Sequence, residues 1–337
     1  MITKVGIENL RGIRSGELDG LAAVSVLVGP NNSGKSTCLE AIELASFGSN
    51  VGSAVKLFRR RGGSAFGALH HVTTGDAGRS NVRVDRHDGS ATSWFDLTTN
   101  YTPDWYQVAL QDRMNPPFIG ARLGCQGSAT SILLDTTGRL STPFGSVMPG
   151  PFHARLVDVG AVRAERALED AYSDIDRGGR LESVLGALQA SMPGLVDLRI
   201  LKTEDEFVLH MFMSDGTRVP AYLAGDGAKR MIELAAALAE VGTGVALLED
   251  PECYQHPRYL RELVALIRFA ASAGTQIILS THSVELIDAL LQAEWPPEAA
   301  YPSVHRLRLD AGQLRSTVLS REQALVAREE LLEDLRA

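Results

Sequence analysis

A short run of glycine, serine, threonine and lysine near the amino terminus has the spacing of a phosphate-binding loop. Residues 29–37 read Gly-Pro-Asn-Asn-Ser-Gly-Lys-Ser-Thr and match the pattern G-x-x-x-x-G-K-[ST] in full. The two glycines let the backbone wrap around phosphate oxygens, and the amides at the start of the next helix supply positive potential. We therefore predict nucleotide binding through residues of this run: Gly29, Asn31, Asn32, Ser33, Gly34, Lys35, Ser36 and Thr37.

Two of these side chains have a specific expected task. Lys35 is expected to reach the β- and γ-phosphates, and the Ser36 hydroxyl is expected to be a ligand of Mg²⁺. The alternative is a chance glycine-rich turn, which the apolar run before the loop and the helical pattern after it argue against.

Two carboxylates follow a buried strand in the second half of the chain. Residues 245–252 read Val-Ala-Leu-Leu-Glu-Asp-Pro-Glu, so an apolar strand ends in acids. Acids at such a strand end suit Mg²⁺ and an attacking water. If Glu249 lies on the metal side, Asp250 is the candidate general base or water-positioning group. The alternative is a polar strand end that faces solvent.

Hydrophobic patterning predicts the elements that position these groups. Residues 4–10 alternate as a half-buried strand, and residues 21–28 form a continuous apolar run, typical of a strand covered on both faces. Strands that alternate with helices in the outer thirds predict an α/β fold with a mainly parallel core sheet, and we expect a side sheet with an irregular insertion over residues 49–150. Further strands are expected at 198–201, 207–213, 244–248 and 276–279, and helices after Gly34 and at 181–192, 227–240, 259–271 and 321–336.

Four motifs, in order along the chain, resemble those of the ABC-type ATPases of the SMC, RecF and OLD group, which are AAA-family ATP-binding proteins. The phosphate loop, with Asn-Leu-Arg-Gly at 9–12, is similar to their opening segment. Residues 223–230 resemble the signature loop, residues 248–257 the Walker B strand with the segment after it, and residues 280–283 the switch-histidine motif.

The resemblance implies a P-loop NTPase fold of the ABC-head type, with an antiparallel amino-terminal side sheet. It implies hydrolysis of ATP with Mg²⁺ in a head-to-head dimer. ATP would then lie between Lys35 of one subunit and Gly225, Asp226 and Gly227 of the other, and His282 would contact the same phosphate. A lone histidine is more often structural, but its place after a buried strand in this motif order favours the switch role.

Some residues depart from the group's pattern. Ala224 stands where a serine is expected, which removes one hydroxyl donor to the γ-phosphate. The usual Asp-then-Glu order is reversed at Glu249 and Asp250, so the candidate base is the shorter acid and we expect slow hydrolysis. No glutamine occurs between Lys35 and Tyr106, so the glutamine loop is not assigned, with His70 or His71 as alternatives.

The whole chain, 1–337, is expected to form one ATPase module. We divide it into an amino-terminal lobe with the phosphate loop (1–50), a side sheet, insertion and helical lobe (51–220), and a part with the signature loop, Walker B strand, switch histidine and terminal helix (221–337). The residues after His282 do not form the acid pattern of a Toprim nuclease. The sequence contains no long heptad segment, so we expect no coiled-coil arm.

Composition limits the partners and the compartment. A net charge of −8 and a pI near 5.5 argue against a nucleic-acid coat protein. Three dispersed cysteines, no signal-peptide core and no apolar run of membrane-spanning length predict a cytoplasmic protein. The densest basic cluster is either a solvated helix end or a nucleic-acid contact, and it consists of Lys56, Arg59, Arg60 and Arg61. Leucines over 325–335 suit docking on this chain or in a partner's groove.

Three functions remain open at this stage. The first is a dimeric ATPase switch that regulates a separate effector, a nuclease or toxin, in a prokaryotic anti-phage defence system. The second is a DNA-repair or DNA-binding clamp of the RecF or SMC type. The third is a nucleotide-dependent scaffold with very slow turnover.

Overall fold

The computed structural model describes eleven segments of the chain. The basic cluster at 56–61, His70 and His71 lie outside them. The described segments are 1–46, 79–86, 93–98, 118–125, 128–135, 140–144, 152–157, 168–177, 179–203, 206–296 and 301–336.

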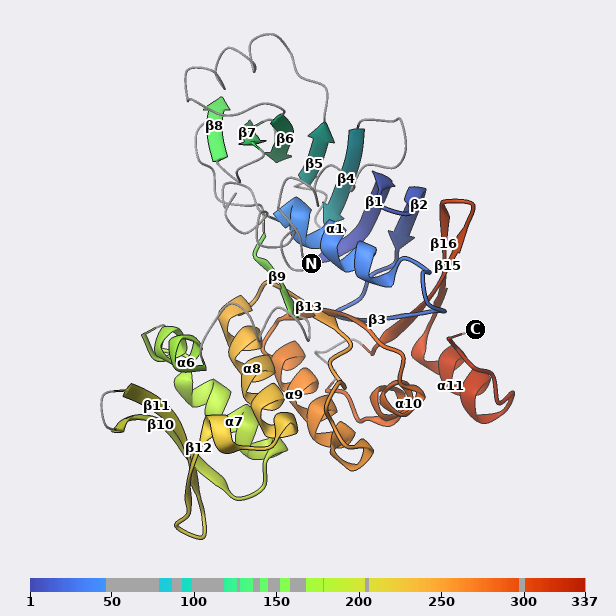
Figure 1. The fold of residues 1–337 in the computed structure, drawn as a ribbon. Coiled ribbons are helices and arrows are strands. Elements are labelled where there is room, and N and C mark those ends of the chain that lie inside the picture. Colours follow the sequence, from blue (N-terminus) through green and yellow to red (C-terminus); the bar gives the residue numbers. More distant parts are fainter. Residues whose placement is uncertain are drawn as a thin grey trace.

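A large mixed sheet joins both ends of the chain (Figure 1). Within the described residues it has thirteen strands in the order β8-β7-β6-β5-β4-β1-β2-β16-β15-β3-β14-β13-β9. Their bounds are β1 (Ile2–Leu10), β2 (Ile13–Asp19), β3 (Val24–Val28), β4 (Arg79–Arg86), β5 (Ser93–Thr98), β6 (Phe118–Cys125), β7 (Ser128–Asp135), β8 (Leu140–Phe144), β9 (Ala154–Val157), β13 (Val245–Glu249), β14 (Gln276–Ser280), β15 (Ser303–Asp310) and β16 (Gln313–Leu319).

The five strands at one end of this sheet run parallel to one another. β9, β13, β14, β3 and β15 pair in parallel in that order, and the carboxyl ends of β3, β13 and β14 carry the predicted motifs. From β8 to β4, and on through β1 to β2, all pairs are antiparallel. The predicted α/β class, with a parallel core and an antiparallel amino-terminal side sheet, is confirmed.

Helices cover both faces of the parallel core (Figure 1). α1 (Lys35–Ser46) packs on one face in a cluster with Leu247 and Ile278, whereas α8 (Asp226–Val241), α9 (Leu260–Ser272) and α10 (Val284–Gln292) share the other face with Leu248 and Leu279. The two clusters alternate along each strand, as expected of strands that are buried on both sides. Packing on both faces and parallel pairing fix the carboxyl ends of β13 and β14 relative to each other.

A smaller antiparallel sheet lies beside the helices (Figure 1). It consists of β10 (Leu195–Thr203), β11 (Glu206–Met213) and β12 (Arg218–Pro220), and it packs against α6 (Leu168–Arg177) and α7 (Leu181–Ser191). A single 3₁₀ turn, η2 (Ala221–Leu223), then leads into α8. A second 3₁₀ turn, η3 (Pro257–Tyr259), precedes α9.

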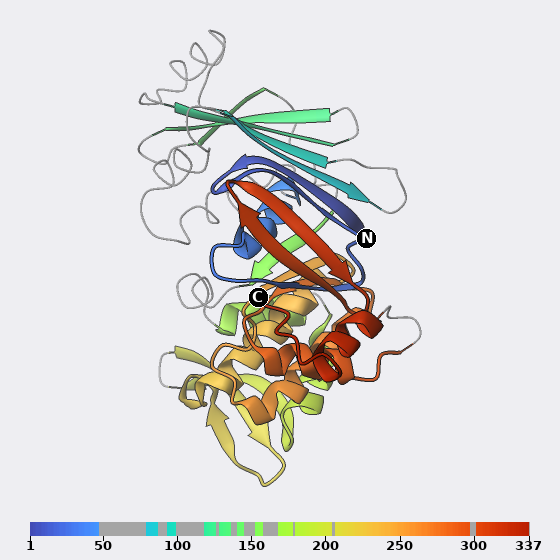
Figure 2. The ribbon, with the colours of Figure 1, turned by 90° about the vertical axis from the view of Figure 1, so that its right-hand side faces the viewer.

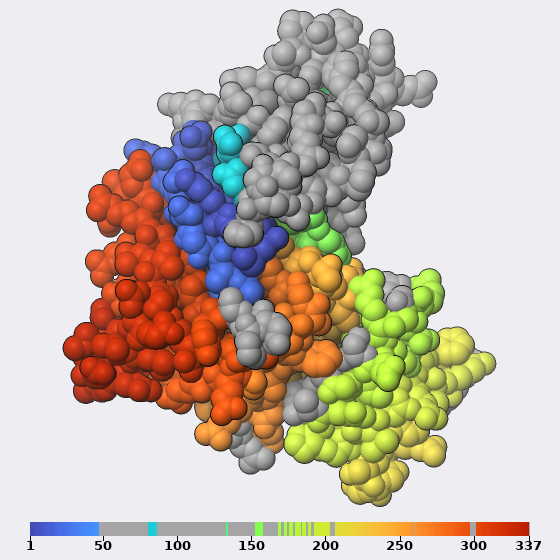
Figure 3. Space-filling model, turned by 180° about the vertical axis from the view of Figure 1, so that it is seen from behind, coloured from blue at the N-terminus to red at the C-terminus, as the bar shows by residue number. Residues whose placement is uncertain are grey.

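The two ends of the chain meet in the large sheet. The hairpin of β15 and β16 lies beside β1 and β2 (Figure 2), because β16 pairs in parallel with β2. Seen from behind, amino-terminal residues in blue lie against carboxyl-terminal residues in red (Figure 3). The side chain of Gln276 adds a tie, since it bonds to both the N–H and the carbonyl of Ile2 at 2.7 Å.

One predicted element is shorter than expected. The terminal helix, predicted over 321–336, ends at Glu329 as α11 (Arg321–Glu329), and the chain then turns back over the molecule. Leu332 has a φ of 52° and is 82% exposed, whereas Leu335 is 1% exposed and belongs to the core. The charged sequence of 330–336 is compatible with a helix, but tertiary contacts of Glu333 and Leu335 hold it in another path.

Candidate functional site

The phosphate loop has a backbone that only small residues allow at two positions. Gly29 has a φ of 146°, and a Cβ there would lie 2.4 Å from the carbonyl oxygen of Leu307 and 2.8 Å from Ser33 Oγ. Gly34 has a φ of 94°, and Asn32 between them has a φ of 63°. These conformations curl the loop between β3 and α1 into a cradle for phosphate oxygens, so the residues present fit a nucleotide phosphate.

Lys35 lies inside this cradle. Its side chain is largely buried, and Nζ donates to the carbonyl oxygens of Gly29 at 2.8 Å and Pro30 at 2.9 Å. Burial lowers the pKa of Lys35, and the negative charge of Asp250 opposes that change. The ammonium group thus lies among loop oxygens, where phosphate oxygens would offer charged replacements.

The other loop residues line the rim and the helix start. Ser36 and Thr37 stand half-buried in the first turn of α1, where backbone amides lack intrahelical acceptors. Asn31 and Asn32 are exposed at the tip, and Ser33 is buried beneath it.

The predicted acids lie where β13 ends. Glu249 is the last residue of β13 and is paired in register with Ser280 of β14. By strand alternation it shares the face of Val245 and Leu247, which pack in the cluster of α1. Asp250 follows with a φ of 43°, and its N–H donates to the carbonyl oxygen of Ser280 at 3.1 Å.

Asp250 lies within electrostatic reach of two predicted site residues. Burial raises the pKa of Asp250, while the positive charges of His282 and Lys35 lower it. Its Oδ1 is buried with no hydrogen-bond partner in the part of the chain that the structure describes. The structure therefore brings Lys35, Asp250 and His282 together at the carboxyl edge of the parallel strands.

Glu252 is a site residue that the sequence analysis did not single out. Its Oε1 accepts hydrogen bonds from the hydroxyl of Thr281 and, at 3.3 Å, from the N–H of His282. Burial raises the pKa of Glu252 despite the hydrogen bond from Thr281. The only sequence signal for Glu252 was its place as the third acid of residues 249–252. Its partner Thr281, just after β14, could not be read from the sequence.

His282 stands two residues beyond β14 and is exposed. Burial of part of the ring, with the charges of Lys35 and Arg336, lowers the pKa of His282, whereas Asp250 raises it. The next residue, Ser283, caps α10 by accepting from the N–H of Leu286 at 3.0 Å. The histidine is thus carried on a short turn fixed at both ends.

The glycine-rich loop lies at the amino end of α8. Gly225 is the N-cap residue, Asp226 opens the helix, and Ala224 precedes them. The carbonyl of Gly227 accepts from Gln255 Nε2 at 2.9 Å, so this loop is joined to the segment that follows Asp250. Its expected place opposite a second subunit's phosphate loop stays a prediction.

No ready-made metal cage is found in the described segments. No group of three or more His, Cys, Asp and Glu side chains that could hold a metal ion occurs in them. A magnesium ion held by Ser36 and Glu249 would take its other ligands from phosphates and water, the usual arrangement for this ion. Over the same segments, no helix is long and apolar enough to cross a membrane.

Two segments of the chain match models of ATPase families, and one relative matches part of it. Residues 1–56 match a family model described as an AAA ATPase domain, and residues 142–288 match one described as an AAA domain, putative AbiEii toxin, Type IV TA system. An uncharacterized protein of Methanocaldococcus jannaschii, MJECL11, is 32% identical over 114 residues, which cover 33% of this chain and 98% of that protein.

Two further similarities concern SMC-type proteins. The DNA double-strand break repair Rad50 ATPase of Methanopyrus kandleri is 55% identical over 47 residues, which are 14% of this chain and 5% of Rad50. The Smc head domain of Pyrococcus furiosus, solved with an extended coiled coil and bound to the C-terminal domain of ScpA, superposes with a TM-score of 0.54 at 13% identity, covering 98% of this chain and 99% of that one.

A G-x-x-x-x-G-K-[ST] loop between the parallel strand β3 and the helix α1, in a sheet core covered by helices, is the arrangement of the P-loop ATPase fold. Residues 1–56 and 142–288 thus match models of AAA-type ATPase domains, and the overall fold is similar to that of an Smc head domain.

Proposed function

We propose that the protein binds ATP with Mg²⁺ and hydrolyses it to ADP and phosphate, slowly, as a dimeric switch. The observation that carries the proposal is the meeting of Lys35, Asp250 and His282 beside the phosphate loop. A cradle of backbone amides with a lysine for the phosphates and an acid to orient the attacking water suits phosphoryl transfer to water.

Each residue has a task in the reaction. Lys35 neutralises charge on the β- and γ-phosphates, and the α1 amides hold their oxygens. Asp250 orients the attacking water and accepts its proton, while the oxygen that bridges to ADP leaves with the bond electrons. Burial raises the pKa of Asp250, which makes its carboxylate a better base than an exposed one. His282 hydrogen-bonds the γ-phosphate.

Magnesium, held by Ser36 and Glu249 together with phosphate oxygens, would neutralise the charge that develops on those oxygens. Glu249 shares the sheet face of α1, the helix that carries Ser36. This placement supports the division of tasks in which Glu249 serves the metal and Asp250 serves the water.

A second copy of the chain would complete the site. The loop of Gly225, Asp226 and Gly227 opens α8, where the amino end of the helix and its dipole favour a phosphate. In the described structure this loop contacts Gln255 of its own chain. We infer that it closes over the nucleotide bound by the other subunit.

The biological output we propose is control of a separate effector, a nuclease or toxin, in a prokaryotic defence system. The match over 142–288 to a model described with the AbiEii toxin supports it. That the Pyrococcus furiosus head was solved with a ScpA domain supports a protein partner. The Rad50 match favours the alternative, a DNA-binding clamp, in which the basic cluster of Lys56, Arg59, Arg60 and Arg61 would contact DNA.

Phosphate release and nucleotide binding test the ATPase proposal. Lys35→Ala is expected to abolish both, whereas the matched control Lys202→Ala, an exposed lysine on β10, keeps wild-type values. Mg²⁺-dependent turnover that persists in Lys35→Ala would refute the assignment of the phosphate loop.

A capture experiment tests the output. The Asp250→Asn protein, isolated from its own cells with and without ATP, is expected to retain a nuclease or toxin only with ATP. Salt-sensitive DNA binding that is lost when Arg59, Arg60 and Arg61 become Glu would instead favour the clamp.

A further inference from the structure

The backbone of His282 is held from both sides. Its N–H donates to Glu252, and its carbonyl oxygen accepts from Arg336 Nη1 at 2.7 Å. The first bond comes from the segment after β13. The second comes from residues 330–336, which follow α11 and which we name the carboxyl-terminal strap.

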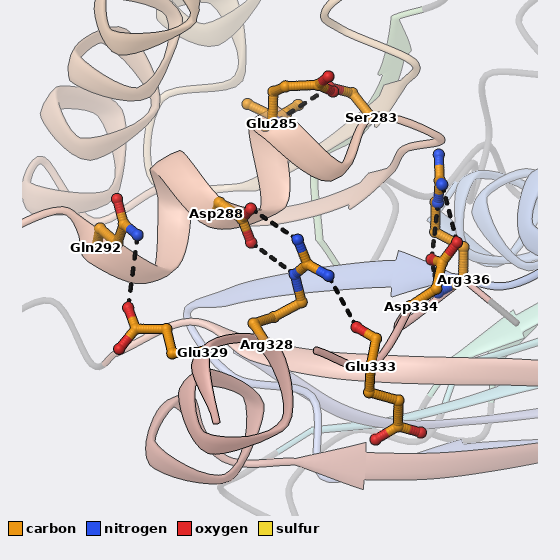
Figure 4. A network of polar contacts seen from close by, with 10 residues as sticks. Ser283, Glu285, Asp288, Gln292, Arg328, Glu329, Glu333, Asp334 and Arg336 are labelled. Carbon is orange, nitrogen blue, oxygen red and sulfur yellow. Dashed lines mark hydrogen bonds and ion pairs between the residues drawn. The ribbon is translucent and has the colours of Figure 1, made fainter. Parts of the chain in front are cut away.

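Two anchors fix the strap to the body of the protein (Figure 4). Arg328 of α11 binds Asp288 of α10 with two bonds of 2.8 and 2.9 Å, and its third nitrogen, Nη1, donates to the carbonyl of Glu333 at 2.8 Å. Leu335 is buried in the core shared with α10. The strap therefore follows the position of α10 and α11.

A pair of hydrogen bonds to Asp334 orients the guanidinium group of Arg336. Its Nε and Nη2 each donate to Asp334 at 2.9 Å (Figure 4). These two bonds leave Nη1 for the carbonyl oxygen of His282. A bidentate pair fixes the plane of the guanidinium as well as its distance. The two bonds from Arg336 hold the pKa of Asp334 down, at about 2.

We propose that Arg336 is a positioning residue for the switch histidine. Through the carbonyl of His282 it fixes the turn after β14, so that the imidazole stays beside Lys35 and Asp250. This inference rests on the proposed ATPase function. It makes the strap the path by which a partner bound to α10 or α11 would change turnover, because displacing either helix pulls Arg336 away from the turn.

Two of the groups around the imidazole, Lys35 and Asp250, also act in the proposed reaction. Lys35, Asp250 and Arg336 interact with it electrostatically, and Glu252 binds its backbone. Without the hydrogen bond from Arg336, the imidazole of His282 could move away from Lys35 and Asp250 while the phosphate loop stays intact. The expected signature is a change in kcat without a change in nucleotide binding.

Steady-state kinetics test the proposal with three variants. Arg336→Ala is expected to lower kcat about tenfold with little change in KM for ATP, since small misplacements of a catalytic group cost up to ~10²-fold. Arg336→Lys keeps one donor but loses the fork with Asp334, so its kcat should lie between Ala and wild type. Arg315→Ala, an exposed arginine on β16, is the matched control and should leave kcat unchanged.

Hydrogen–deuterium exchange gives a readout that does not need turnover. Arg336→Ala is expected to speed exchange in the peptide over 280–286 while the peptides of α10 and α11 keep wild-type rates. Unchanged exchange at 280–286, or an equal rise across both helices with a lower Tm, would overturn the positioning role. A wild-type protein without ATP turnover would refute the proposed function. The exchange experiment would still show whether Arg336 holds the turn at His282.

Discussion

The hydroxyl of Thr281 donates to the carboxylate of Glu252, which ties the residues after β14 to those after β13. The two strands are parallel neighbours, with Glu249 opposite Ser280. The proposed base, Asp250, directly follows β13, and the switch residue, His282, lies two residues beyond β14. The bond between Thr281 and Glu252 therefore sets the distance between the base and the switch residue.

A double-mutant cycle on this pair measures the tie. Glu252→Ala and Thr281→Val each remove it, and we expect a coupling of about 1.5–3 kcal/mol in the free energy of unfolding, the range for a hydrogen bond to a charged group. Glu252→Gln keeps an acceptor oxygen and should lose less. Urea unfolding of the wild type, Glu252→Ala, Thr281→Val and the double variant gives the coupling. Effects that add within about 0.5 kcal/mol would show that the two side chains act independently.

Asp250→Asn separates binding from hydrolysis. The amide has the size of the acid but accepts no proton, so turnover should fall about 10²-fold or more while ATP still binds. The ATP-bound dimer should then persist, which light scattering at saturating ATP would detect. Asp310→Asn, an exposed aspartate at the end of β15, serves as the control. A monomer under these conditions would contradict the dimer, and unchanged turnover would remove Asp250 from the reaction.

Gly29→Ala tests the cradle itself. Its Cβ would lie 2.4 Å from the carbonyl oxygen of Leu307, so the loop has to move and we expect ATP binding to be lost. Gly216→Ala is a matched control, because Gly216 also has a positive φ, 86°, but open space around it. Gly216→Ala should cost about 1–2 kcal/mol of stability, because its Cβ is strained at a positive φ, and should leave ATP binding intact. Calorimetric titration with ATP compares them, and normal binding by Gly29→Ala would mean that the cradle is wrongly described.

The parts of the fold that were predicted are those that a local pattern determines. The run of apolar residues in β13 and β14 and the glycine spacing of the phosphate loop are sufficient by themselves. The hairpin of β15 and β16 was missed because buried polar residues break its alternation: Ser303 and His305 are both buried in β15.

The parts of the site that were missed depend on which elements become neighbours. Glu252 has a role only because β13 and β14 pair in parallel, and the sequence does not state that pairing. Arg336 was expected on a helix, since residues 330–336 have a helix-compatible pattern. The contacts of Arg328 and Leu335 override this local preference and bring Arg336 to His282.

His305 should make the protein less stable in mild acid. Its ring is fully buried, Nε2 bonds to Ser303 Oγ at 3.1 Å, and Nδ1 has no hydrogen-bond partner among the described residues. Burial lowers the pKa of His305 from 6.5 to about 4, although the charge of Asp19 opposes the change. Because the folded state has the lower pKa, the unfolded state binds more protons between these values.

The stabilisation is therefore complete above pH 6.5 and is lost as the pH falls toward 4. A difference of this size corresponds to about 3 kcal/mol in the free energy of unfolding. Urea unfolding as a function of pH checks it: His305→Asn should flatten the slope over this range, whereas His153→Asn, at an exposed histidine, should keep the wild-type slope. Equal slopes in all three proteins would mean that His305 does not titrate differently on folding.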